Sequence, residues 1–194
     1  MKYSQKNYDS LVGIEGFSEQ LLKNHFVLYQ GYVTNAQKIS DALIEMERNG
    51  KSSTPEYAEL KRRFAWEFNG MRLHELYFEN ITKNINESKI PPRIKALIEN
   101  DFGSFDEWAN SFKTTGLIRG IGWVILYYDP SEKRLYNAWI NEHDSGHLAC
   151  CTPLLIMDMF EHAFMLDYGL KKADYIKSFF AAIDWQAVEF RLPK

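Results

Sequence analysis

Apolar positions recur with a helical period through the first half of the chain. After Phe17-Ser18, which resembles a staple residue followed by an N-cap, an apolar stripe steps by three and four residues. Its members are Leu22, His25, Tyr29, Tyr32, Ala36, Ile39, Leu43 and Met46. This spacing predicts an amphipathic helix of about eight turns. Asn49-Gly50 predicts its end, because glycine readily adopts the conformation that closes a helix.

A second long helix is predicted after a short loop. Thr54-Pro55 has the form of an N-cap followed by proline at the first helical position. The apolar face that follows carries Phe64, Phe68, Met71, His74, Phe78 and Ile81. Because the loop is short, we expect the two helices to form an antiparallel hairpin. Residues 1–16, which are polar and contain glycine, are interpreted as an arm.

The pattern changes after the polar segment 84–92, which ends in two prolines. We place a domain boundary there, with a helical hairpin domain over 1–88 and an α/β domain over 89–194. Short apolar runs bounded by turn residues predict antiparallel strands, and periodic segments around them predict helices. The strands are expected at 122–128, 134–141 and 153–157, and the helices at 92–101, 104–115, 160–168, 172–182 and 184–190. The predicted fold class is α+β, with a small three-stranded antiparallel sheet.

Composition narrows the class of protein. The chain has 194 residues, of which 45% are hydrophobic and 25% charged, close to the averages for globular proteins. The net charge is −3 and no basic stripe is present, so a nucleic-acid partner is not expected. No apolar run approaches the roughly 20 residues of a membrane span. The adjacent Cys150 and Cys151 suit a reducing compartment, and the polar start shows no signal peptide, so we expect a cytoplasmic protein.

Three of the five histidines lie where a metal site can form. His25 and His74 are on the apolar stripes of two helices that should pack together, and His162 follows Asp158 by four residues after a buried strand. A buried imidazole needs partners for both nitrogens. Hydrogen bonds within the core are the common solution, but one shared metal would serve several imidazoles at once. Three imidazoles and one carboxylate form a donor set suited to iron or manganese, and also to zinc.

Longer motifs resemble the iron/manganese superoxide dismutases over most of residues 17–190. The family pattern begins with an apolar strand and Asp-x-Trp-Glu-His-Ala, and continues with a tyrosine and later Asp-Tyr and a tryptophan. The second half of this chain resembles this pattern. The residues in place are Asp158, Glu161, His162, Ala163, Tyr168, Asp174, Tyr175 and Trp185. Looser matches are the helix segment 69–78 around His74, Tyr32-Val-Thr-Asn35, and Gly122-Trp123.

The resemblance implies a function and a metal site. The reaction would be disproportionation of superoxide to dioxygen and hydrogen peroxide at one iron or manganese ion per subunit. The ligands would be His25, His74, Asp158 and His162, with a solvent molecule as the fifth. Tyr32 would be the gateway tyrosine at the open face of the metal.

Other roles implied by the resemblance lie around the ligands. Trp123 and Phe160 would stand beside the metal, although both are core aromatics in any case. Glu161 would reach across a homodimer interface to the partner subunit's His162, in a dimer or a tetramer. Lys172 occupies the position of a family arginine near the substrate funnel, so we expect it to help steer the anionic substrate.

The chain also departs from the family pattern. His25 precedes Tyr32 by seven residues where the family has eight, and Leu28-Tyr29 replaces the usual histidine. Phe160 stands in place of tryptophan, and Met165 in place of the tyrosine that pairs with that histidine. Seven residues at about 100° each fall about 20° short of two full turns. We therefore expect an unbroken α-helix that keeps His25 and Tyr32 on one face, without the π-bulge that the longer spacing suggests. The alternative is that Asn24 takes the ligand position.

Two histidines compete for one further role. The family places a glutamine or histidine after the second strand, hydrogen-bonded to the metal-bound solvent. We assign this catalytic role to His143, with His147 as the competitor. The alternative to an enzyme is a non-catalytic homologue that binds iron or manganese. A di-iron carboxylate protein is disfavoured, because the Glu-x-x-His motifs it requires are missing from both long helices.

Overall fold

Capping side chains set the start of each long helix. In the computed structural model, which describes residues 2–84 and 89–193, α1 runs from Glu19 to Arg48 and α2 from Pro55 to Phe78. The Ser18 hydroxyl accepts a hydrogen bond from the Leu21 backbone N–H at 3.1 Å. The Thr54 hydroxyl does the same for the Tyr57 N–H at 3.3 Å. Each cap satisfies a backbone donor that the first helical turn leaves free.

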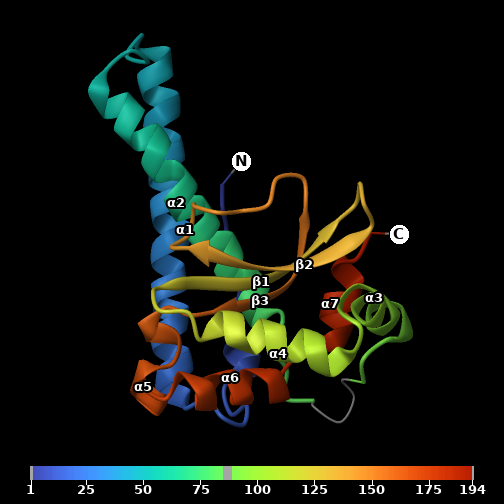
Figure 1. Ribbon diagram of the computed structural model, residues 1–194. Coiled ribbons are helices and arrows are strands. Elements are labelled where there is room, and N and C mark those ends of the chain that lie inside the picture. Colours follow the sequence, from blue (N-terminus) through green and yellow to red (C-terminus); the bar gives the residue numbers. More distant parts are fainter. Residues whose placement is uncertain (1, 85–88, 194) are drawn as a thin grey trace.

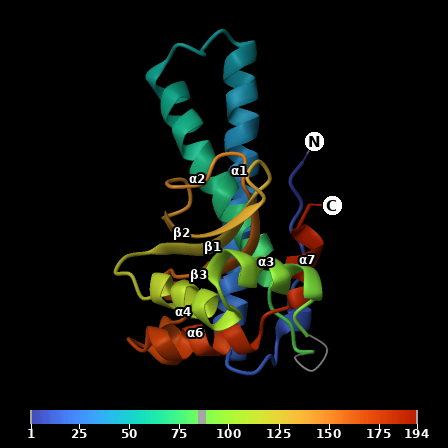
Figure 2. The same ribbon diagram turned by 45° about the vertical axis from the view of Figure 1, so that its right-hand side comes forward.

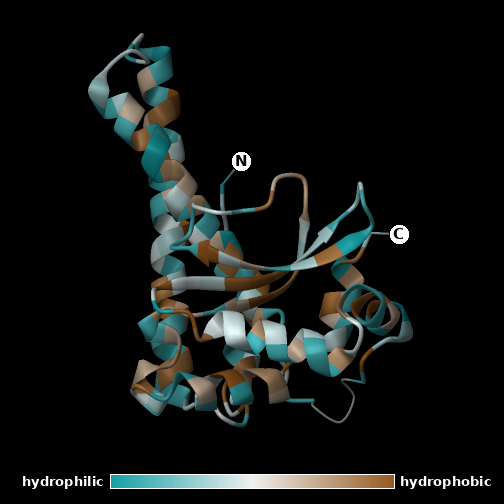
Figure 3. Ribbon diagram, viewed as in Figure 1, coloured by the Kyte–Doolittle hydropathy of each residue, from teal (hydrophilic) through white to brown (hydrophobic). Residues whose placement is uncertain are grey.

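The two helices form the expected antiparallel hairpin, whose tip projects beyond the rest of the molecule (Figures 1 and 2). The apolar stripe of α1 is largely buried, including His25 and Tyr29. Figure 3 shows that hydrophobic residues lie along the central strands, whereas the tip of the hairpin is largely hydrophilic. The start of α1 and the end of α2, which carry His25 and His74, lie where the hairpin packs against the rest of the chain.

The second half of the chain builds a small sheet flanked by helices, which confirms the α+β fold class. Strands β1 (Gly122–Asp129), β2 (Arg134–Asn141) and β3 (Thr152–Asp158) form one antiparallel sheet in the order β2-β1-β3. Helix α4 (Phe105–Gly116) packs against this sheet, and α6 (Lys172–Ala181) lies beyond α4 in both views (Figures 1 and 2). Helices α3 (Pro92–Phe102) and α7 (Trp185–Arg191) also belong to this half of the chain.

Strand register decides which residues meet beside the hairpin. Gly122 pairs with Asn141 of β2, and Trp123 pairs with Asp158 of β3. The start of β1 and the ends of β2 and β3 therefore share one edge of the sheet. This edge brings Trp123, Asp158 and the loop that carries His143 together.

The prediction of one helix over 160–168 is wrong. The segment forms a 3-10 turn, η3 (Glu161–Ala163), and a separate short helix, α5 (Met165–Tyr168). The Asp158 side chain accepts a hydrogen bond from the Phe160 N–H at 2.8 Å, and Phe160 is extended. Such a local side-chain bond competes with helix formation. The resulting turn directs His162 back toward Asp158.

The N-terminal segment is more than a polar arm. It contains the 3-10 turn η1 (Asp9–Leu11), and Leu11 and Ile14 are buried. The Tyr3 N–H donates to the Gln37 side chain at 2.7 Å, so the segment lies along the hairpin. Although the segment is mostly polar, its scattered aromatic and aliphatic residues pack against the core.

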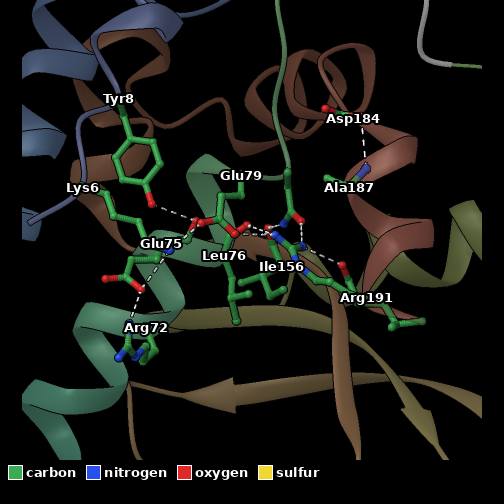
Figure 4. Close-up of polar contacts among 12 residues, drawn as sticks. Lys6, Tyr8, Arg72, Glu75, Leu76, Glu79, Ile156, Asp184, Ala187 and Arg191 are labelled. Atoms are coloured by element: carbon green, nitrogen blue, oxygen red, sulfur yellow. Dashed lines mark hydrogen bonds and ion pairs between the residues drawn. The ribbon is translucent and has the colours of Figure 1, made fainter. Parts of the chain in front are cut away.

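Arg191 of α7 joins three parts of the fold (Figure 4). Its guanidinium donates to the backbone oxygen of Leu76 at the end of α2 (3.2 Å) and to that of Leu154 in β3 (2.9 Å). It also contacts Glu79 at 3.3 Å and donates to the Asn80 side chain. A cation at the C-terminal end of α2 also complements the helix dipole. This residue therefore holds together the two elements that carry His74 and Asp158.

The expected domain boundary between residues 88 and 89 falls at the edge of 85–88, outside the described residues, and stays a prediction. Within the described residues the two halves are closely connected. Thr82 N–H donates to the Ala182 carbonyl at 2.9 Å, and the Asn80 side chain donates to the Ile156 carbonyl at 2.7 Å. Over the residues that the structure describes, no helix has both the length and the apolarity to cross a membrane.

Candidate metal centre

Four side chains from separate elements converge between the hairpin and the sheet. His25 comes from α1, His74 from α2, Asp158 from the end of β3 and His162 from η3. Each offers one ligand atom, and these atoms all lie within 4.8 Å of one another. His25, His74 and Asp158 are buried, whereas the His162 side chain is 23% exposed. The cluster therefore reaches the surface on the side of His162.

Asp158 is the centre of the cluster. Its Oδ2 atom lies 3.2 Å from Nε2 of His25, 3.2 Å from Nε2 of His162 and 3.6 Å from Nε2 of His74. Burial by itself raises the pKa of Asp158, but the neighbouring His162 and His25 hold it well below its usual range. The carboxyl group is therefore an anion with three imidazole nitrogens around one of its oxygens.

The backbone orients two of these ligands. Nδ1–H of His74 donates to the Gly70 carbonyl one turn earlier at 2.5 Å, so the lone pair of the neutral ring is on Nε2. The Phe160 N–H donates to Oδ1 of Asp158 at 2.8 Å. Such hydrogen bonds fix the orientation of metal ligands. Nδ1 of His25, by contrast, is buried without a hydrogen-bond partner among the described residues.

The donor set fits a bound metal ion. Burial lowers the pKa of His25 and lowers that of His74 further, so both rings are neutral. The lone pair on Nε2 of His74 then faces the Asp158 carboxylate at 3.6 Å, and a cation between these two acceptors would satisfy both. Imidazole and carboxylate donors without thiolate suit iron or manganese. His25, His74, Asp158 and His162 can therefore hold one such ion.

The expected unbroken first helix is confirmed, since α1 is α-helical throughout. His25 and Tyr32 lie on its inner face, and the Tyr32 ring stacks on His74 with a centroid distance of 5.1 Å. His25, and not its neighbour Asn24, points toward Asp158. The seven-residue spacing therefore places Tyr32 against the cluster without a bulge.

A hydrogen-bonded chain lies beside the cluster. The Trp123 indole N–H donates to Nδ1 of His143 at 3.1 Å, and Nε2 of His143 lies 2.7 Å from the Tyr32 hydroxyl. Burial lowers the pKa of His143 to about 4, so the ring is neutral near pH 7. Because Nδ1 accepts from Trp123, the ring proton is on Nε2 and is donated to Tyr32. The Tyr32 hydroxyl hydrogen then remains free to be donated toward a ligand.

Phe160 fills the space between two of these histidines. Its ring stacks on His143 at a centroid distance of 4.6 Å and on His162 at 5.3 Å. Trp123 is fully buried and meets His74 edge to face at 5.0 Å. These aromatic rings keep water away from the buried side of the cluster.

The structure separates the two competing histidines. His143 is buried against Tyr32, whereas His147 is exposed and lies 2.7 Å from the Tyr127 hydroxyl. Nε2–H of His147 donates to the His143 carbonyl at 2.8 Å. His147 therefore contacts the backbone of the loop, whereas His143 contacts the site.

Two of the expected site residues lie outside the cluster. Lys172 donates to the carbonyls of Gly120 and Ile118 at 3.3 and 3.5 Å, so its ammonium group is bound to the loop before β1. Glu161 is exposed on the surface near Lys172 and raises the pKa of that lysine, although burial lowers it overall. Their expected roles in steering and in a subunit interface stay predictions.

Sequence reasoning missed three residues that contact the site. Trp66 meets the ring of His143 edge to face at 4.8 Å. Gly70 accepts the His74 hydrogen bond, and the Tyr77 ring packs on that of His25 at a centroid distance of 5.2 Å. Gly70 and Tyr77 are four residues before and three after His74, so helical spacing alone could have identified them.

Comparisons with known proteins agree with this geometry. The sequence profile described as iron/manganese superoxide dismutases, C-terminal domain, matches residues 90–191. An iron superoxide dismutase of Cupriavidus metallidurans is 36% identical over 183 residues, which cover 92% of this chain and 89% of the relative. A manganese superoxide dismutase of Haloarcula marismortui is 33% identical, covering 92% and 86%. An iron superoxide dismutase of Aquifex pyrophilus is 31% identical, covering 100% and 92%.

Proposed function

The chain belongs to the iron/manganese superoxide dismutase family, and we propose that it converts superoxide to dioxygen and hydrogen peroxide at one iron or manganese ion. The observation that carries this proposal is the four-donor cluster beside Tyr32, whose ring stacks on His74 and whose hydroxyl is hydrogen-bonded to His143. A protein that only stored a metal would need the donors but not the hydrogen-bonded chain. The proposal therefore favours an enzyme over a metal-binding homologue.

We assign the metal to His25, His74, Asp158 and His162. A bound iron or manganese ion supplies one-electron redox chemistry between its +3 and +2 states. The single anionic carboxylate and three neutral imidazoles leave a net positive charge on either oxidation state. That charge favours the approach of an anionic substrate.

The protein's own groups supply hydrogen bonds to the reacting oxygen species. Formation of one hydrogen peroxide from two superoxide ions consumes two protons, which solvent supplies. Burial raises the pKa of Tyr32 above its usual range, and Asp158 and Glu67 raise it further, so the phenol keeps its proton. We propose that Tyr32 donates a hydrogen bond to the reacting oxygen species, while His143 holds the phenol in place through its Nε2–H.

Trp123 and Phe160 support this arrangement without direct contact with substrate. Trp123 fixes the tautomer of His143, and Phe160 stacks between His143 and His162. In a site lined by aromatic rings the effective dielectric constant is low, which strengthens each remaining polar interaction.

The decisive experiment separates metal binding from catalysis. The purified protein is stripped of metal, reloaded separately with iron, manganese or zinc, and assayed for metal content and for superoxide consumption. We expect about one ion per subunit with each metal, and activity with iron or manganese but none with zinc, which has no redox chemistry. Stoichiometric binding without activity for iron and manganese would instead establish the metal-binding homologue.

We also propose that the chain forms a homodimer, or a tetramer built from dimers, through the surface around Glu161. Several large apolar side chains are exposed near this residue: Leu117, Ile118, Ile121, Met165, Leu166 and Leu170. Glu161 would then approach the partner subunit's His162. Sedimentation of the metal-loaded protein tests the dimer, and Leu166→Glu should yield monomers. We place the protein in the cytoplasm, because two adjacent free cysteines suit a reducing compartment.

A further inference from the structure

A charged pair, Arg63 and Glu67, lies on α2 next to the residues that surround His143. The Arg63 side chain is 55% exposed, and its guanidinium carbon lies 5.0 Å from the centroid of the Trp66 ring. Trp66 also meets His143 edge to face at 4.8 Å, and His143 contacts Tyr32. One half-buried indole therefore separates the Arg63 cation from the hydrogen-bonded chain of the site.

Arg63 is held in this position by a buried partner. Its Nε–H donates to Oε1 of Glu67 at 2.9 Å, and Nη2 lies 2.7 Å from the same oxygen. The Glu67 side chain is only 4% exposed, and the Asn35 amide donates to its second oxygen at 3.4 Å. The cation thus faces solvent, while the anion lies beneath it.

The geometry connects this pair to the site. Arg63 reaches the His143–Tyr32 pair through the single ring of Trp66. Glu67 accepts a hydrogen bond from Asn35, three residues after Tyr32 on α1. The ammonium group of Lys172, by contrast, is bound to the carbonyls of the loop before β1. Arg63 is therefore better placed than Lys172 to influence an anion that approaches Tyr32.

We propose that Arg63 is the cation that steers superoxide into this centre and that Glu67 both positions it and limits its effect. The proposal rests on the proposed dismutase function. Because the chain carries a net charge of −3, an anionic substrate needs a local positive field to be drawn to the entrance. Loss of Arg63 would remove that field and leave the Glu67 carboxylate without its cation.

The pair permits a test with charge changes of opposite sign. A unit charge about 10 Å from an anion in water changes its local concentration about twofold. We expect Arg63→Gln to lower kcat/KM for superoxide about twofold to fourfold at 10 mM ionic strength, where the Debye length is about 30 Å. We expect Glu67→Gln to raise it by a similar factor. Both differences should disappear near 1 M salt, where the Debye length is about 3 Å.

Matched variants control for net charge. Arg62→Gln makes the same change on the neighbouring residue, whose side chain is 71% exposed and pairs with Glu59 on the outer face. Lys172→Gln tests the steering residue that the sequence suggested. In both variants kcat/KM should stay close to the wild-type value at every salt concentration. A reduction by Lys172→Gln equal to that of Arg63→Gln would overturn the assignment.

A second readout does not depend on turnover. Azide is a small anion, and its binding to the metal-loaded protein can be followed by absorption. Its Kd should rise about twofold in Arg63→Gln and fall in Glu67→Gln at low ionic strength. If wild type is active but neither variant changes kcat/KM or azide binding with salt, the steering role is wrong. If wild type itself is inactive with iron and manganese, it is the proposed function that fails.

Discussion

Tyr32 packs directly on the backbone of Gly70. A Cβ atom on Gly70 would lie 2.5 Å from Cδ1 and 2.9 Å from Cγ of the Tyr32 ring, closer than carbon atoms approach. Because Gly70 has no side chain, the ring can lie against α2, stack on His74 and reach His143. The same residue accepts the hydrogen bond of His74, so Gly70 positions both residues.

Gly70→Ala should therefore impair catalysis more than stability. The methyl group would push the Tyr32 ring away and break its contact with His143, and we expect at least a tenfold loss of activity per bound metal, on the scale of positioned proton donors. The higher helix propensity of alanine contributes up to about 1 kcal/mol and offsets part of the steric cost. Gly31→Ala is the control, because a Cβ there meets nothing within 4 Å. Full activity in Gly70→Ala would show that Tyr32 does not need its present position.

Trp123→Phe tests the hydrogen-bonded chain. The change keeps the buried ring but removes the N–H that donates to Nδ1 of His143, so the ring is no longer confined to the tautomer that donates to Tyr32. We expect about a tenfold drop in kcat with unchanged metal content. Trp139→Phe is a matched control, since its indole donates to Asn141 away from the site. Equal losses in the two variants would argue against a role for the tautomer.

The buried neutral His143 makes stability depend on pH. Burial lowers its pKa to about 4, whereas a histidine in the unfolded chain titrates near 6.5. Between these values the unfolded chain binds a proton that the folded chain does not. The free energy of unfolding should therefore fall as the pH is lowered from about 6.5 to about 4, by up to about 3 kcal/mol from this residue.

His143→Gln removes this dependence and keeps a side chain able to donate to Tyr32. Denaturant unfolding of wild type and variant at several pH values isolates the contribution, because the other histidines titrate in both proteins. The stability difference between wild type and His143→Gln should shift by about 2–3 kcal/mol against wild type between pH 7 and pH 4. A difference that does not change with pH would mean that His143 becomes protonated in the fold at its ordinary pKa.

Arg191→Ala should destabilise the junction of α2, β3 and α7 (Figure 4). The Arg191 side chain is only 11% exposed, and its loss leaves the carbonyls of Leu76 and Leu154 and the carboxylate of Glu79 without this donor. We expect a loss of about 3 kcal/mol in the free energy of unfolding. Arg191→Lys keeps the positive charge but not the planar set of guanidinium donors, and its loss of free energy of unfolding should be smaller. Arg134→Ala removes a side chain that is 55% exposed and lies at the limiting distance of 4.0 Å from Asp101, so it should change stability by less than about 1 kcal/mol.

The sequence by itself determined the features that depend on local spacing. The steps of three and four placed His25, Tyr29 and Tyr32 on one face of α1, and the seven-residue interval predicted the unbroken helix that the structure contains. Caps such as Ser18 and Thr54 located the helix starts to within about two residues. Short apolar runs located all three strands. These features follow from backbone geometry over a few residues, which the order of the side chains specifies directly.

Other local features were misjudged because a single side chain changed the backbone path. The bond from the Phe160 N–H to Asp158 turned an expected helix into η3 and a separate α5. Buried Leu11 and Ile14 attached the expected arm to the hairpin. In each case the segment has the helical or polar pattern that the sequence analysis described. A hydrogen bond or a buried side chain that is not part of that pattern determines its structure.

The tertiary structure alone decided which of these surfaces meet. Trp123, His143 and Tyr32 are separated by 20 and 111 residues along the chain, and only the strand register and the packing of the hairpin against the sheet edge bring them together. The placement of Arg63 and Trp66 beside His143 depends in the same way on where α2 and the loop after β2 lie. Contacts between distant segments depend on the combined packing of many side chains. The spacing of residues within one segment therefore cannot predict them.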